Sequence, residues 1–155
     1  MAKKLAKLLA LGLMVIMALG LAACGQEKEI TFEIGSAGVP SSYWGHDSEQ
    51  PIKVIVRSLE EWNNSEAAEL ITIDEKYDAE FFTDNALVIV AFRTTSGPCE
   101  VEKITASKSG NRLNLVINAT AGVQTVISGA VVAIEVRKHD IVGVKNIELT
   151  TNIGY

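Results

Sequence analysis

Hydrophobic and polar residues alternate along much of the chain after residue 29. Alternation is typical of β-strands with one buried face, and it is clear at residues 30–34, 52–57, 113–117 and 144–150. Residues 86–92 are instead uniformly apolar and rich in Val and Ile, which predicts a central strand buried on both faces. About seven short strands spaced near ten residues apart predict a mostly-β fold, a small antiparallel β sandwich or barrel.

One helix is expected to pack against this β structure. Ser58 and Glu61 form a Ser-x-x-Glu capping box, in which the Ser hydroxyl accepts from the third backbone N–H of the helix. We expect the helix to run to about Glu69, with its apolar side chains facing inward, namely Leu59, Trp62 and Leu70. Residues 77–85 predict a single helical turn or two.

The first 23 residues follow a different pattern. A basic start of three lysines precedes an almost wholly apolar run at residues 8–21. This run is shorter than the roughly 20 residues of a bilayer-spanning helix and fits a secretory signal segment. Leu21-Ala22-Ala23-Cys24 follows it and resembles the lipobox of bacterial lipoprotein signal peptides.

That resemblance implies a processed and membrane-anchored protein. Residues 1–23 would be removed as a lipoprotein signal peptide, and the Cys24 sulfur would carry a diacylglyceryl group. Two acyl chains hold a protein firmly to a membrane. Residues 24–29 would form the lipidated tether and residues 30–155 a single β-rich domain. The expected location is the extracytoplasmic face of the cell membrane.

Charge and cysteine content narrow the classes of partner. Without the three lysines of the signal segment, 11 basic residues remain against 19 acidic ones, a net charge of −8 for residues 24–155. Nucleic acid is disfavoured as a partner, because phosphate binding needs clustered Lys and Arg. Cys24 and Cys99 are the two cysteines, so no disulfide framework or Cys-based metal site is expected. Cys99 is interpreted as a small, partly buried hydrophobic residue.

No catalytic constellation stands out. His46 and His139 lie far apart in the sequence, and the nucleophile-elbow, dinucleotide-binding and P-loop motifs are absent. We therefore expect no enzyme, no cofactor and no metal site. Nine carboxylates lie within residues 60–84, without the order of acidic residues that an EF-hand needs. They are interpreted as a solvated acidic face, and a cation sensor built on residues 74–84 is the alternative.

Two loops are candidates for partner binding. Tyr43 and Trp44 place two large aromatic residues in a segment rich in Gly, Ser and Pro, and Thr95-Ser96-Gly97 follows the predicted buried strand. Exposed aromatic residues on loops of a rigid β scaffold are common in recognition sites. The alternative for Trp44 is that it packs over the core.

Residues 74–138 resemble the protease-complex-subunit-B C-terminal domain family. The resemblance is carried by Tyr77-Asp78-Ala79-Glu80-Phe81-Phe82 and by the strand that begins Asn85-Ala86-Leu87-Val88. It implies a β domain that binds a protein, with an extracytoplasmic protease as the expected class of partner. The loop reads Thr-Ser-Gly-Pro-Cys at residues 95–99, where that family often has an aromatic residue.

Together these features predict a membrane-tethered, non-enzymatic binding domain. Its expected partners are the membrane, through the diacylglyceryl group on Cys24, and an envelope protein or protease. A small-ligand or cation sensor and a structural envelope lipoprotein are the alternatives.

Overall fold

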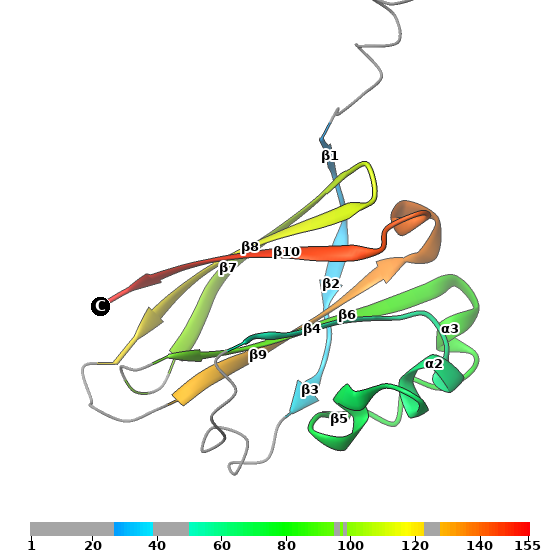
Figure 1. Cartoon of the computed structure of the whole chain (residues 1–155), viewed down its shortest axis with the longest axis horizontal. Coiled ribbons are helices and arrows are strands. Elements are labelled where there is room, and N and C mark those ends of the chain that lie inside the picture. Colours follow the sequence, from blue (N-terminus) through cyan, green and yellow to red (C-terminus); the bar gives the residue numbers. More distant parts are fainter. Residues whose placement is uncertain (1–26, 39–49, 95–96, 98, 123–127) are drawn as a thin grey trace, which may run out of the picture.

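The computed structural model describes residues 27–38, 50–94, 97, 99–122 and 128–155 (Figure 1). Two four-stranded sheets dominate this part of the chain. The first sheet contains, in spatial order, β1 (Lys28–Glu29), β7 (Cys99–Ser109), β8 (Arg112–Ala121) and β10 (Asn146–Gly154). The second contains β2 (Phe32–Ile34), β9 (Ser128–Arg137), β6 (Asn85–Thr94) and β4 (Ile52–Val56). The predicted mostly-β fold is confirmed.

Shorter elements complete the described fold. A two-stranded sheet pairs β3 (Ala37–Gly38) with β5 (Thr72–Ile73). The helical segments are α2 (Leu59–Asn63), α3 (Phe81–Asp84) and two 3₁₀ turns, η2 (Glu66–Glu69) and η3 (Lys138–Ile141). Figure 1 shows α2, α3 and β5 gathered beside the second sheet.

The pairing of β8 with β10 is parallel, whereas the other pairs of described strands are antiparallel. After β8 the chain crosses to the second sheet and runs back along β9. It then turns through η3 at the end of the molecule where β8 began, so β10 repeats the direction of β8 (Figure 1). This arrangement leaves β10 as an edge strand of the first sheet.

Strand β6 is central and buried on both faces, as its apolar run predicts. Val88 and Val90 belong to the core between the two sheets, which also contains Leu115. Leu87 and Ile89 belong to a second core under the helical segments. Each face of β6 therefore has its own apolar layer, because side chains alternate along a strand.

Helix α2 begins as predicted and ends early. The Ser58 hydroxyl accepts from the Glu61 N–H at 3.0 Å, while the Glu61 carboxylate accepts from the Arg57 N–H. The helix stops at Asn63, because both the amide and the hydroxyl of Ser65 donate to the Trp62 carbonyl. Such local side-chain bonds compete with the helical pattern.

Three apolar side chains were expected to face inward from this helix, and one of them does. Trp62 is buried. The prediction is wrong for Leu59 and Leu70, which are 39% and 38% exposed. A helix of five residues presents only about one turn toward the sheet, so Leu59 falls at its outer start and Leu70 follows η2.

Candidate functional site

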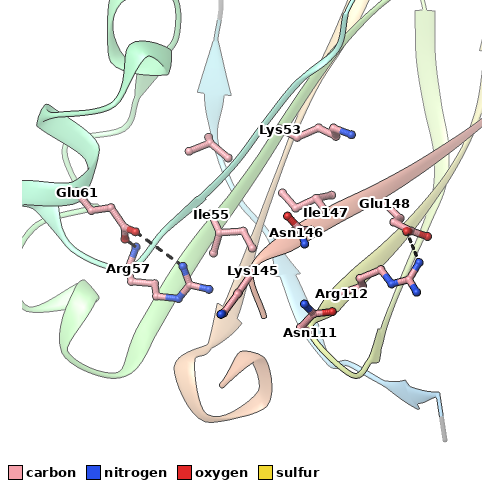
Figure 2. Close-up of a pocket in the computed structure, with 11 residues that line it drawn as sticks. Lys53, Ile55, Arg57, Glu61, Asn111, Arg112, Lys145, Asn146, Ile147 and Glu148 are labelled. Carbon is pink, nitrogen blue, oxygen red and sulfur yellow. Dashed lines mark hydrogen bonds and ion pairs between the residues drawn. The ribbon is translucent and has the colours of Figure 1, made fainter. Parts of the chain in front are cut away.

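An opening lies between the two sheets where their edge strands β4 and β10 face each other (Figure 2). On the opposite side the chain passes directly from β1 to β2, which joins one sheet to the other. We call this opening the β4–β10 cleft. Its volume is about 750 Å³, within the range typical of ligand sites.

The cleft has an apolar floor and a charged rim. Ile55 of β4 and Ile147 of β10 line it, and each is only 8% exposed. Four basic side chains also line it, namely Lys53, Arg57, Arg112 and Lys145. Two carboxylates, Glu61 and Glu148, accompany them. The formal charge of the lining is therefore +2, opposite in sign to that of residues 24–155 as a whole.

The two arginines are held by partners within the protein. Arg57 donates from Nη2 to the Val144 carbonyl at 2.6 Å, which ties the end of β4 to the turn before β10. Its Nη1 lies 3.8 Å from a Glu61 carboxylate oxygen. Arg112 Nη1 donates to Glu148 Oε1 at 2.6 Å, and this hydrogen bond raises the pKa of Arg112. Figure 2 shows both pairs at the rim of the cleft.

The two lysines are not paired in this way. Within the described ranges, no carboxylate oxygen lies within 4.0 Å of the ammonium group of Lys53 or Lys145. They sit on opposite walls, Lys53 on β4 and Lys145 just before β10 (Figure 2). Their charges are therefore available to an anionic group in the cleft.

Both walls also carry backbone hydrogen-bonding groups. Among the strands that the structure describes, β4 pairs with β6 alone and β10 with β8 alone. The outer edge of an edge strand presents N–H and C=O groups that another strand can use. The β4–β10 cleft thus combines an apolar floor, two uncommitted ammonium groups and two strand edges.

Of the residues predicted to carry lipid or to bind a partner, the structure describes Gly97. Cys24, Tyr43, Trp44, Thr95 and Ser96 fall outside the described residues. Gly97 has a positive φ of 82°, and its carbonyl accepts from the Thr94 hydroxyl at 3.1 Å. It lies between the end of β6 and the start of β7, at the opposite end of the sheets from the β7–β8 turn (Figure 1).

The carboxylates of residues 74–84 do not gather at one point. In the described part of the chain, no three His, Cys, Asp or Glu side chains are placed to hold a metal ion. Two of these carboxylates bind nearby backbone instead. Asp74 accepts from the Lys76 N–H, and Asp78 accepts from the Phe81 N–H at the start of α3.

The aromatic residues of segment 77–82 have structural roles. Tyr77 is 2% exposed, and its hydroxyl donates to Glu135 Oε1 at 2.9 Å and accepts from the Ser36 N–H at 2.7 Å. It thereby joins the segment before α3 to β9 and to the chain after β2. Phe82 is buried in the core beneath the helical segments.

Cys99 is partly buried, as predicted, and packs against the core between the sheets. Burial raises the pKa of its thiol. The thiol is therefore held in its protonated form, which is the opposite of what an activated cysteine nucleophile needs.

Comparison of the chain with known protein families, with curated proteins and with solved structures finds no match. No helix in the described ranges is both long enough and apolar enough to cross a membrane.

Proposed function

We propose that this protein is a non-enzymatic binding domain, anchored through acyl chains on Cys24 to the extracytoplasmic face of the cell membrane. Its recognition site is the β4–β10 cleft. The observation that carries this proposal is the sign of the cleft's charge. A lining of net +2 lies within a chain whose residues 24–155 carry −8, and such a local contrast selects an anionic partner.

The start of the folded domain supports a short connection to the membrane. Glu27 accepts hydrogen bonds from the Ser107 hydroxyl and the Asn114 amide, and Lys28 pairs with Asp140 at 2.9 Å. The hydrogen bonds to Glu27 lower the pKa of its carboxyl. Lys28 and Glu29 of the proposed tether pair with β7 as strand β1. The four residues 24–27 extend at most about 14 Å, so an anchor at Cys24 would hold the domain close to the bilayer.

The partner that fits this site is an envelope protein with an acidic segment, and an extracytoplasmic protease is one such class. The family resemblance of residues 74–138 points the same way. A cation sensor is not proposed, because Asp74 and Asp78 bind the local backbone and no three carboxylates of residues 74–84 are placed together to hold a metal ion.

The anchor is tested by replacing Cys24. The full chain is expressed in a bacterium that processes lipoproteins, and cells are separated into membrane and soluble fractions. We expect the unaltered protein in the membrane fraction with an acylated Cys24 by mass spectrometry, and the Cys24→Ser variant without acyl chains. An unmodified thiol at position 24 of the membrane-bound protein would refute the anchor.

The site is tested by crosslinking in the same cells. A photoreactive amino acid replaces Asn111 at the cleft or, as the control, Lys103 on β7 outside it. We expect capture of an envelope protein from position 111 that is lost when Lys53 and Lys145 are both changed to Glu. Equal capture of the same protein from position 103 would rule out the cleft as the recognition site.

A further inference from the structure

We propose that the β4–β10 cleft receives an acidic peptide segment in extended conformation, added as a strand along the outer edge of β4. This inference rests on the proposed function and specifies the form in which the partner is bound. It is carried by the strand edge of β4 that no other described strand pairs with, by the apolar floor and by the two lysines of the cleft.

The backbone of β4 provides the pairing edge. Its five residues pair with β6 from Ile52 opposite Ala91 to Val56 opposite Leu87. In an antiparallel pair, alternate residues exchange hydrogen bonds with the partner strand, and the residues between them direct N–H and C=O groups outward. The outer edge of β4 therefore offers a row of such groups along about 17 Å. Peptides bind to exposed sheet edges of this kind in strand-addition complexes.

The charges of the cleft favour the β4 edge over the β10 edge. Lys53 belongs to β4, and no acidic residue lies within that strand. Strand β10 contains Glu148, whose carboxylate is already paired with Arg112. An acidic strand along β4 faces the ammonium group of Lys53 on its own wall and that of Lys145 across the cleft.

The floor of the cleft defines the spacing of the bound sequence. Side chains of an added strand alternate between its two faces. Lys53 and Ile55 are two residues apart on β4, so both lie on the face of that strand that lines the cleft. One face of the added strand therefore meets both the basic and the apolar side chains. The matching segment has acidic and apolar residues at alternate positions of that one face.

A small anion matches the cleft less well than a strand does. The basic groups come from separate walls, and both arginines already hold partners within the protein. A single phosphate or carboxylate at one wall would contact one lysine and leave the other lysine and the strand edge without a ligand. An added acidic strand would contact both lysines and the edge of β4.

The test measures binding of a labelled peptide of three Glu-Thr-Val-Thr repeats, in which Glu and Val alternate on one face of the strand, to the full lipid-anchored chain in detergent micelles. Two further peptides have the same sequence but are N-methylated at alternate backbone amides, one in each register. N-methylation removes hydrogen-bond donors without changing charge. We expect the parent peptide to bind and one N-methylated register to bind about tenfold more weakly than the other. A peptide with Gln in place of Glu should also lose about tenfold in affinity.

Protein variants give the matching control. The double variant Lys53→Glu with Lys145→Glu should weaken binding of the parent peptide by about tenfold or more, whereas Lys103→Glu should change it less than about twofold. Circular dichroism and thermal unfolding establish that each variant is folded. The inference is wrong if both N-methylated peptides bind as tightly as the parent, or if inorganic phosphate displaces the peptide at equal concentration. Either result leaves the Cys24 anchor and the crosslinking at position 111 untouched, so it separates this inference from the proposed function.

Discussion

Replacing Tyr77 with Phe removes one oxygen atom and tests whether the Tyr77 hydroxyl stabilises the fold. The aromatic ring, which lies edge-on to Phe81 with centroids 4.8 Å apart, stays in place. The hydroxyl hydrogen bonds to Glu135 and to the Ser36 N–H are lost. The variant therefore isolates the polar contribution of Tyr77 from its packing.

The expected cost follows from these two contacts. A neutral hydrogen bond contributes about 1 kcal/mol to stability, and a bond to a charged group contributes about 1.5–3 kcal/mol. Glu135 keeps its ion pair with Lys76 at 2.7 Å, so the loss of the hydrogen bond from Tyr77 leaves the Glu135 carboxylate with one partner. The Ser36 N–H loses its acceptor. We expect the free energy of unfolding to fall by about 2 kcal/mol, which for a domain of this size lowers Tm by about 6–10 °C.

The assay is thermal unfolding followed by circular dichroism, with Tyr155→Phe as the matched control. Tyr155 is 80% exposed, so its hydroxyl should contribute almost nothing. Burial raises the pKa of Tyr77 above its ordinary value of 10.0. The unfolded chain therefore ionises first, and the stability advantage over the Phe variant should shrink as pH rises above about 10. A Tm for Tyr77→Phe equal to that of Tyr155→Phe would refute the structural role.

A second substitution places the same hydroxyl in a double-mutant cycle. A Cβ added at Gly35 would lie 2.7 Å from the Tyr77 hydroxyl oxygen and 3.2 Å from the Ala133 Cβ. Gly35→Ala should cost about 1–3 kcal/mol through overpacking, whereas Gly38→Ala, with open space around it, should cost less. In the Tyr77→Phe background the cost of Gly35→Ala should fall, because the closest atom is gone. Simple additivity would contradict the geometry.

Two further predictions concern the surface of the domain. Ser58→Ala removes the acceptor for the Glu61 N–H and should lower the free energy of unfolding by about 1 kcal/mol. Ser58→Thr keeps a hydroxyl acceptor and should retain most of the stability of the unaltered protein. Asp140→Asn should cost about 0.5 kcal/mol at neutral pH, because it breaks the pair with Lys28. The hydrogen bond from Lys28 lowers the pKa of Asp140 below its ordinary value of 3.8. The difference in stability between the unaltered protein and Asp140→Asn should therefore disappear as pH falls below 3.8, because Asp140 becomes protonated. Urea unfolding at several pH values measures both effects, and a pH-independent gap for Asp140→Asn would contradict the second.

Local patterns predicted the parts of the fold that local physics determines. The apolar run at residues 86–92 predicted the doubly buried strand, since two buried faces remove the alternation. The Ser58 N-cap could also be predicted, because the Glu61 N–H that donates to its hydroxyl lies only three residues away. The length of the following helix was not, since Ser65 ends it through bonds that a helical pattern does not reveal.

The last strand shows where sequence patterns fail. Alternation predicted residues 144–150, whereas β10 spans Asn146–Gly154. Its second half contains Asn152 and Gly154, residue types that are typical of turns. The Asn152 amide donates to Asn118 Oδ1 at 2.8 Å on the parallel neighbour β8. A polar pair between strands 34 residues apart stabilises this half, and no local window contains both partners.

The β4–β10 cleft was missed for the same reason. Its charged residues come from separate segments at residues 53–61, 111–112 and 145–148, and none of these segments is a basic cluster by itself. The parallel return of β10 beside β8 brings the last two segments together, and the packing of the two sheets adds the first. Under the proposed function, the net negative charge of the domain would repel an acidic partner from the rest of the surface, whereas the positive lining would attract it to the cleft. Binding of an acidic segment would therefore be confined to this one edge of the molecule.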